Sequence, residues 1–318
     1  MREPAPAVAP PAERDRGTTA CAREELLRRY PSIERFERDV GLPAEQMAEA
    51  FELEREFHRA VLAEPSAERR RALAEEIYAR VFAIYGFEFK VPQDTGPSPR
   101  DPLVRLLLPE LRGKAILDVG CGAGEFLFAC SRLAEPDRLL GIDVFVTPLE
   151  LPERRLRFVR GDVVEFTLPD PPFDVAMSDN VYEHVAPQDV PRHLDSIRRA
   201  LKPGGTLVLL MPNRHFGPWD VTRILDDSYS GRTPAQGTHL NETTYAELLP
   251  RLAQSGFGRF RSLWPTARSR GQRPGARVPS RLFALAERIG PLLRRLQALD
   301  KRARLTEFEV SVIATRVR

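Results

Sequence analysis

The sequence predicts a doubly wound α/β domain with a parallel sheet, preceded by an α-helical segment. Two observations lead to this prediction. From about residue 103, short apolar runs alternate with helical patterns, which is typical of a parallel sheet wrapped by helices. A glycine-rich turn follows the first of these runs, where a strand passes directly into a helix. The apolar runs are Ala115–Val119, Leu139–Ile142, Leu156–Val159, Phe173–Met177 and Thr206–Met211.

The composition is that of a globular protein, with 42% hydrophobic and 29% charged residues. No run approaches the roughly 18 apolar residues that a membrane-spanning helix needs. Residues 1–20 are rich in Pro and Ala and contain no apolar h-region, so we expect a disordered tail and no signal peptide. The three cysteines show no ligand-like spacing, which indicates a reducing, cytoplasmic location without disulfides or a zinc site.

An α-helical subdomain is predicted for residues 21–95. A helical pattern covers residues 22–40, and a later helix is capped by Ser66 and ended by Gly86. The Pro- and Gly-rich connector VPQDTGPSPRDP then separates this subdomain from the sheet-forming domain, which we assign to residues 100–318.

The pattern becomes irregular after the fifth apolar run. We expect residues 216–245 to form a cap over the substrate. A helix near Thr243–Gln254, a strand over Phe257–Trp264 and a final strand over Phe308–Thr315 follow it.

A strongly basic segment lies at residues 267–304. It contains eleven Lys or Arg residues against two acids, so the rest of the chain is net acidic although the whole carries +3. We therefore expect a local basic surface and no general nucleic-acid interface. Leucines near helical spacing predict a basic helical insertion before the last strand, with a kink at Gly290-Pro291. Such a helix can contact an anionic membrane or substrate weakly. We favour a helix packed on the sheet edge with a solvated arginine face.

The strongest motif is ILDVGCGAGEF, in which a strand leads into Gly120, Gly122 and Gly124 and then a helix. Glycines allow a tight turn and let a ligand approach the backbone. A dinucleotide site would have the spacing G-x-G-x-x-G beside a pyrophosphate, which Glu125 would repel. An acidic turn that also contains Asp118 suits a cationic ligand without phosphate better.

Four further motifs follow in order. An acid 19 residues after the third glycine closes the second strand, where a ribose diol is bound in such sheets. A Gly-Asp pair follows the third strand, polar residues end the fourth, and a turn enters the fifth. Ligands of open α/β sheets bind outside such strand ends. The motifs are Asp143, Gly161-Asp162, Ser178-Asp179-Asn180 and LKPGG at 201–205.

These five motifs in this order resemble the class I S-adenosylmethionine-dependent methyltransferases. They are most similar to the small-molecule branch that includes ubiquinone-biosynthesis and secondary-metabolite O-methyltransferases. The resemblance covers roughly residues 103 to 260. It implies a seven-stranded Rossmann-like sheet of order 3-2-1-4-5-7-6 with an antiparallel last strand, and S-adenosylmethionine as cofactor.

The resemblance also implies roles for individual residues. The glycine turn would line the methionine and adenosine, Asp143 would hold the ribose hydroxyls and Asp162 would meet the adenine. The segment Ser178 to Asn180 would flank the methyl donor. The full set of expected cofactor-binding residues is Asp118, Gly120, Cys121, Gly122, Gly124, Asp143, Val144, Gly161, Asp162, Val163, Ser178, Asp179 and Asn180.

One departure from the family pattern concerns the second crossover. Only about a dozen residues, with Pro148 and Pro152 among them, separate Asp143 from the third strand. Parallel crossovers normally contain a helix and need at least that length. We therefore expect the second helix to be shortened or absent.

Methyl transfer is an in-line displacement that can require a base for a hydroxyl acceptor. Histidine titrates near neutral pH. We consider His184, His239 and His215 as catalytic candidates, whereas His58 and His193 lie in helical patterns away from the motifs. Candidate substrate-binding residues are Glu183, Arg214, Trp219 and Asp220.

The sequence thus predicts a methyltransferase acting on a small-molecule acceptor, most simply a hydroxyl group. An N- or C-methyltransferase, an RNA or protein methyltransferase, and a catalytically silent cofactor- or partner-binding protein are the alternatives. No aromatic base clamp follows the fourth strand, which counts against nucleic acid as a substrate. No His, Asp or Glu cluster has metal-ligand spacing, so we predict no metal.

Overall fold

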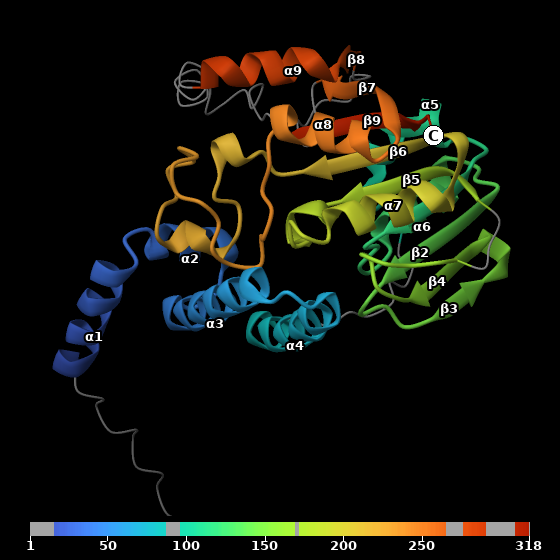
Figure 1. Ribbon diagram of the computed structural model, residues 1–318. Helices are drawn as coiled ribbons and strands as arrows, with labels where there is room; N and C mark the ends of the chain where they lie inside the picture. Colours follow the sequence, from blue (N-terminus) through green and yellow to red (C-terminus); the bar gives the residue numbers. More distant parts are fainter. Residues whose placement is uncertain (1–15, 87–95, 169–171, 265–275, 291–308, 318) are drawn as a thin grey trace, which may run out of the picture.

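The computed structural model describes residues 16–86, 96–168, 172–264, 276–290 and 309–317. Its centre is a nine-stranded sheet of order β3-β4-β2-β1-β5-β6-β9-β7-β8 (Figure 1). The strands are β1 Ala115–Val119, β2 Arg138–Asp143, β3 Leu149–Leu151, β4 Leu156–Arg160, β5 Phe173–Asp179, β6 Leu201–Met211, β7 Phe257–Trp264, β8 Ala276–Pro279 and β9 Val310–Arg316.

The predicted strand order lies within this sheet. The run β4-β2-β1-β5-β6-β9-β7 corresponds to the order 3-2-1-4-5-7-6. Strands β4, β2, β1, β5 and β6 are parallel, and β9 is antiparallel to both β6 and β7. The fold class is therefore confirmed, but the predicted number of seven strands is wrong, because β3 and β8 extend the two edges.

The expected absence of a helix after β2 is confirmed. The chain returns instead as β3, which pairs antiparallel with β4, followed by a 3-10 turn at Pro152–Arg154. The two prolines explain why no α-helix forms in this segment, since proline lacks the N–H that a helix interior requires. The motif LKPGG, expected as a turn, lies within the first five residues of β6.

Helices cover both faces of the sheet. Along β1, Ala115, Leu117 and Val119 belong to one apolar cluster and Ile116 to another, as the alternation of side chains along a strand requires. The first cluster includes residues of α7, α8 and α9, and the second includes residues of α5 and α6. These helices are α5 Asp101–Leu111, α6 Glu125–Leu133, α7 Val190–Ala200, α8 Tyr245–Gln254 and α9 Ser280–Ala286.

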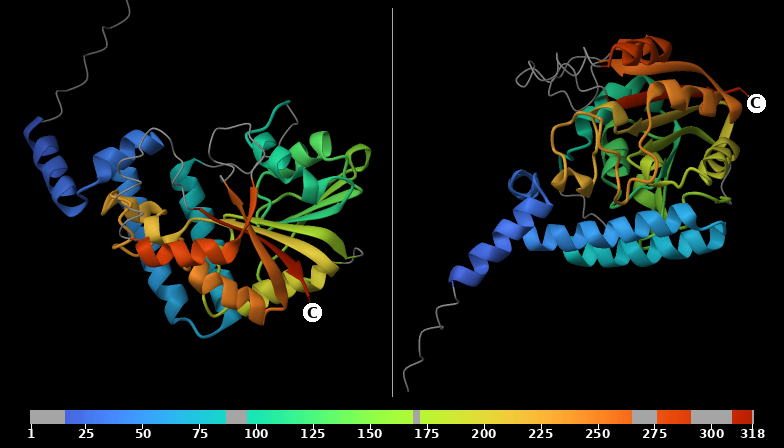
Figure 2. Two further views of the ribbon diagram at one scale, coloured as in Figure 1. Left: turned by 90° about the horizontal axis from the view of Figure 1, so that it is seen from above. Right: turned by 60° about the vertical axis from the view of Figure 1, so that its left-hand side comes forward.

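Four helices lie between Arg16 and Tyr85, in the segment for which the sequence predicted an α-helical subdomain. The pattern over residues 22–40 divides into two helices, because Pro31 interrupts it. The first begins at Arg16, within the segment expected to be disordered. Ser66 accepts a hydrogen bond from the Arg69 N–H, as predicted. The helices are α1 Arg16–Arg29, α2 Ile33–Val40, α3 Ala44–Ala63 and α4 Ala67–Tyr85; α3 and α4 lie side by side (Figure 2).

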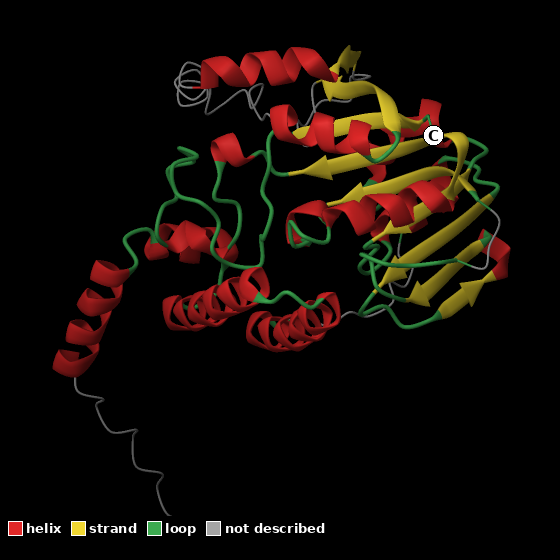
Figure 3. Cartoon of the chain, in the orientation of Figure 1, coloured by secondary structure: helices red, strands yellow, loops and turns green. Residues whose placement is uncertain are grey.

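The predicted cap packs on these helices. Between β6 and α8 the chain is mostly irregular and lies beside α2 and α3 (Figure 3). Val221 and Ile224 share an apolar cluster with residues of α2 and α3, and the Ser32 N–H donates to the Ile224 carbonyl at 2.9 Å. The cap and the N-terminal helices therefore pack together as one unit.

Only part of the basic segment can be compared with its prediction. Residues 265–275 and 291–308 lie outside the described residues, so the predicted kink at Gly290-Pro291 lies at the limit of the described part. Helix α9 and a 3-10 turn at Glu287–Ile289 form within it. Among the helices that the structure describes, none has the length and apolar character needed to cross a membrane.

Candidate functional site

The glycine turn joins β1 to α6 through backbone conformations that favour glycine. Gly120, Gly122 and Gly124 all have positive φ angles, of 74°, 51° and 81°. The Gly120 N–H donates to the Ile142 carbonyl at 2.8 Å, which ties the turn to the end of β2. A Cβ atom at Gly120 would overlap the side chain of Val181. The turn is therefore packed against the chain segment that follows β5.

We expect Gly120→Ala to destabilise the protein by about 1–3 kcal/mol more than Gly113→Ala, because only the first creates an overlap. Gly113 is a matched control, since its φ is also positive, at 68°, and a Cβ there meets nothing within 4 Å. Urea denaturation measures the free energy of unfolding of both variants. Adding Val181→Ala should recover part of the loss at Gly120, and equal losses for the two glycines would contradict the argument.

Asp143 ends β2 beside this turn. Its Oδ2 accepts from the Gly122 N–H at 2.9 Å, and its Oδ1 accepts from the Phe145 N–H at 3.0 Å. A carboxylate has about four acceptor positions, so these two bonds leave capacity for further donors. The carboxylate is thus held in place and can still accept hydroxyl groups from a ligand.

Several acidic side chains lie close to one another near the glycine turn. Asp118 is 4% exposed, and burial together with Asp179 and Asp143 raises its pKa to about 8. Arg100 offsets part of this effect and forms an ion pair with Asp179 at 2.5 Å. A ligand cation at this position would stabilise the ionised carboxylates.

Asp162 follows β4, where the adenine was expected. Its Oδ1 accepts from the Val164 N–H at 2.8 Å, and its Oδ2 accepts from Arg71 of α4 at 3.0 Å. The N-terminal helices therefore contact the predicted cofactor site directly.

A cavity of about 510 Å³ lies between the sheet and the N-terminal helices. This volume is within the range of about 300–1,000 Å³ that is typical of small-molecule sites. Its lining combines predicted cofactor residues at strand ends with side chains of α3, α4 and the cap. The predicted residues that line it are Gly120, Gly122, Asp143, Val144, Asp162, Val163, Asn180, His184, Trp219, Asp220 and His239.

Other predicted residues do not line this cavity. Arg214 pairs with Glu247 at 2.5 Å on the surface, and His215 is next to it in the same 3-10 turn. These two candidates therefore lie outside the lining of this cavity. The remaining predicted residues that do not line the cavity are Asp118, Cys121, Gly124, Gly161, Ser178, Asp179 and Glu183.

Two histidines and a glutamate meet at one side of the cavity. His184 and His239 lie edge to face, with ring centroids 4.7 Å apart. Burial lowers the pKa of His184 to about 3, whereas the pKa of His239 is raised to about 9, because a hydrogen bond to Glu242 and nearby acids outweigh its burial. Glu183 is fully buried beside them, and burial raises its pKa to about 7.

A pair of carboxylates forms a second polar part of the lining. Glu54 of α3 accepts from the Tyr85 hydroxyl at 3.1 Å and from the Thr238 N–H at 2.9 Å. Asp220 accepts from the Gly237 N–H at 2.7 Å. Burial, followed by the charge of Asp220, raises the pKa of Glu54 to about 7. A Cβ atom at Gly237 would overlap both carboxylates, so a side chain there would displace them from their present hydrogen bonds.

The sequence did not identify the α3 and α4 side chains of the lining. Glu54, Arg71, Tyr78, Phe82 and Tyr85 all line the cavity. Their helical spacing resembles that of ordinary core positions. The one signal available in the sequence was an acidic residue at position 54 within an apolar helix face. Acids are rarely fully buried without a partner, so such a residue indicates a polar site.

Comparison with known proteins gives a match to a methyltransferase domain over residues 117–209. The chain is 34% identical over 121 residues to a phthiotriol/phenolphthiotriol dimycocerosates methyltransferase of Mycobacterium leprae, which covers 35% of this chain and 43% of that protein. It is 31% identical over 169 residues to a trans-aconitate 2-methyltransferase of Sinorhizobium fredii, covering 49% and 63%. A fatty-acid O-methyltransferase of Mycolicibacterium smegmatis is 32% identical over 141 residues, covering 39% and 50%.

The alignments thus span less than two thirds of each of these relatives and centre on the sheet domain. The residues matched to the methyltransferase domain, 117–209, include the glycine turn, Asp143 and the end of β5, and the strand order is the one that those motifs imply. The chain therefore contains a methyltransferase domain of the class I S-adenosylmethionine-dependent type.

Proposed function

We propose that the protein transfers the methyl group of S-adenosylmethionine to a small-molecule acceptor, and that the acceptor atom is the oxygen of a hydroxyl group. The observation that carries this proposal is the cavity itself. It joins the predicted cofactor residues to a separate set of aromatic and acidic side chains from the N-terminal helices and the cap.

The residues of the cofactor half fit S-adenosylmethionine. Bound there, S-adenosylmethionine supplies an electrophilic methyl group on a sulfonium. Asp143 would accept from the two ribose hydroxyls, and the Gly120 and Gly122 backbone would face the ligand without a side chain in the way. The acidic groups Asp118 and Asp179 would favour the cationic end of the ligand. Arg100, which the sequence did not single out, pairs with Asp179 and balances part of that charge.

The acceptor half is enclosed by aromatic rings. Tyr78, Phe82 and Phe145 contact one another with ring centroids 5.2 to 6.1 Å apart. These rings would hold an apolar part of the acceptor and exclude water. The relatives include an enzyme named for a fatty acid and one named for trans-aconitate, so the domain accommodates chemically different acceptors. We infer that α3, α4 and the cap determine which acceptor binds.

A side-chain base is available for a hydroxyl acceptor. As the methyl carbon bonds to the acceptor oxygen, its bond to sulfur breaks and the hydroxyl proton must leave. Glu54 has a pKa of about 7, near the optimum for a general base at neutral pH, and it lines the cavity. His239 and His184 line the same space and remain candidates for contact with the acceptor.

The test is release of S-adenosylhomocysteine from the purified protein in the presence of a panel of hydroxylated, carboxylated and amine acceptors. Product should form with an apolar hydroxyl- or carboxyl-bearing acceptor. Glu54→Gln should reduce kcat by about 10–100-fold while S-adenosylmethionine affinity, measured by calorimetry, stays unchanged. Cofactor binding without turnover on any acceptor would favour the silent binding protein, and turnover with amines alone would favour the N-methyltransferase.

A further inference from the structure

We propose that Glu183, His184 and His239 form a binding site for one divalent transition-metal ion at the wall of the cavity. One ligand atom of each residue lies within 4.8 Å of the others. Two imidazoles and one carboxylate form a common protein ligand set for ions such as Zn²⁺, Co²⁺ and Fe²⁺, and three protein ligands leave coordination positions open. The sequence predicted no metal, because His239 lies 55 residues beyond His184 and only the fold brings them together.

The state of Glu183 is the first independent observation. Its side chain is fully buried, and neither carboxylate oxygen has a hydrogen-bond partner among the residues that the structure describes. A buried carboxylate without hydrogen bonds costs several kcal/mol in folding unless a cation compensates it. The charge of the nearby His239 supplies part of that compensation, and a metal ion held together with the two histidines would bind the carboxylate directly.

The hydrogen bonds of His184 are the second observation. Its Nδ1 lies 3.1 Å from the Thr238 carbonyl and 2.8 Å from the Tyr78 hydroxyl. A carbonyl oxygen can only accept, so in the tautomer that bonds to Thr238 the Nδ1 atom carries the hydrogen. In the neutral ring the Nε2 atom then has a free lone pair, which is the form that binds a metal.

His239 is held in the same way by a carboxylate. Its Nδ1 lies 2.7 Å from Glu242 Oε1, and that oxygen also accepts from the Trp219 N–H at 2.8 Å. The arrangement of carboxylate, histidine and open Nε2 is the one that orients metal-ligating histidines in proteins. Thus the Nδ1 atoms of both rings are engaged in hydrogen bonds, and one nitrogen of each ring lies within 4.8 Å of the other ligand atoms.

The position of the site suggests what the ion would do. His184 and His239 line the cavity together with Asn180 and Asp143, so open coordination positions would face the bound molecules. An ion there can bind an acceptor oxygen and lower the pKa of a hydroxyl group. This role rests on the proposed function, whereas the existence of the site does not.

The test is metal binding by the full-length protein, produced without a histidine tag and treated with EDTA. Titration with Co²⁺ should give one ion per chain, with visible absorption bands of a nitrogen- and oxygen-ligated ion. Glu183→Gln and His239→Gln should each weaken binding by at least about 100-fold. Glu242→Gln should weaken it by about 10–100-fold, as substitutions of outer residues do.

His58→Gln is the matched control, because His58 is a partly buried histidine outside the cluster that bonds to the Gly237 carbonyl. It should bind Co²⁺ like the wild type. Far-UV circular dichroism in EDTA confirms that each variant is folded, and if Glu183→Gln does not fold, His239→Gln decides. Absent Co²⁺ binding in the wild type, or equal binding by the cluster variants, overturns the metal site and leaves the proposed function standing. Co²⁺ binding without any affinity for S-adenosylmethionine would overturn only the function.

Discussion

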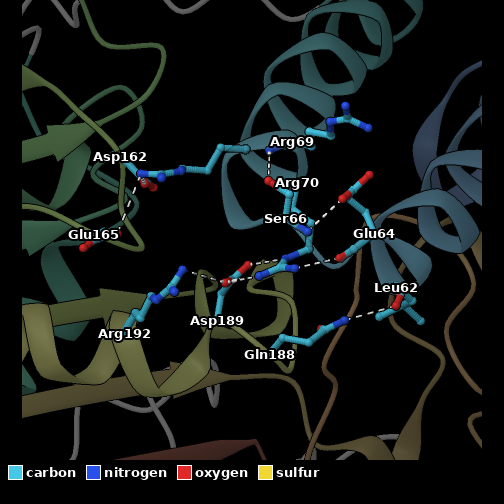
Figure 4. A network of polar contacts seen from close by, with 11 residues as sticks. Leu62, Glu64, Ser66, Arg69, Arg70, Asp162, Glu165, Gln188, Asp189 and Arg192 are labelled. Atoms are coloured by element: carbon cyan, nitrogen blue, oxygen red, sulfur yellow. Dashed lines mark hydrogen bonds and ion pairs between the residues drawn. The ribbon is translucent and has the colours of Figure 1, made fainter.

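Arg70→Ala is expected to lower the free energy of unfolding by about 3–5 kcal/mol, because it leaves a buried carboxylate without its partner. Arg70 of α4 is 5% exposed and Asp189, just before α7, is 3% exposed. Two guanidinium nitrogens donate to the two Asp189 oxygens, at 2.7 and 2.5 Å, and a third donates to the Glu64 carbonyl at 2.7 Å (Figure 4).

The other described cation that pairs with Asp189, Arg192, cannot replace Arg70 at low cost. Arg192 lies 3.9 Å from Asp189, but its side chain is 53% exposed and would have to leave water. The pair also joins the N-terminal helices to the sheet domain, so its loss should loosen the wall of the cavity. Urea denaturation followed by far-UV circular dichroism measures the effect.

Arg80→Ala is the matched control on the same helix. Arg80 pairs with Glu76 at 3.7 Å, and both side chains are mostly exposed. Exposed pairs of this kind contribute about 0–1 kcal/mol. In contrast, the double variant Arg70→Met with Asp189→Leu should recover much of the stability, since apolar replacements of buried pairs are often near neutral. Equal losses for Arg70→Ala and Arg80→Ala would refute the assignment of a buried structural pair.

Asp143→Ala is expected to weaken S-adenosylmethionine binding by at least about 100-fold. Each hydrogen bond to a charged group contributes about 1.5–3 kcal/mol, and two ribose hydroxyls would bond to this carboxylate. Every 1.4 kcal/mol corresponds to a tenfold change in affinity. The substitution also removes the acceptor that holds the Gly122 N–H, so the glycine turn loses an anchor. Calorimetric titration with S-adenosylmethionine measures the loss.

Asp137→Ala is the control for this prediction, because Asp137 is exposed and precedes the opposite end of β2. It should bind the cofactor as the wild type does. Asp143→Asn should give an intermediate affinity, since the amide keeps one acceptor oxygen and loses the charge. If Asp143→Ala bound S-adenosylmethionine normally, the cofactor would have to lie elsewhere in the protein.

Much of the sheet domain could be predicted from the sequence. The five apolar runs became β1, β2, β4, β5 and part of β6, and the helix after the glycine turn begins at Glu125 as expected. Such features depend on side-chain periodicity and on the conformational preferences of glycine and proline within a few residues. The positions of Asp143 and Asp162 at strand ends follow from the same local patterns.

The edges of the sheet could not be predicted in this way. The segment that contains Pro148 and Pro152 was expected only to lack a helix, and its pairing with β4 was not foreseen. Whether a short segment of three residues forms a strand depends on an exposed neighbouring edge, which the segment itself does not encode. The same holds for β8, which pairs with β7 across residues outside the described part.

The acceptor side of the cavity was decided by the tertiary structure. Glu54 meets Thr238, 184 residues away, and Arg70 meets Asp189, 119 residues away. Glu183 and His184 are adjacent in sequence, but His239 joins them only because the cap folds back over the end of β5. The sequence by itself determined the glycine turn and the acid at the end of β2, because periodicity and turn chemistry act over a few residues, whereas the order of the core strands followed from the family resemblance. The tertiary structure decided which distant polar side chains share a buried space, because that depends on how helices and cap pack together.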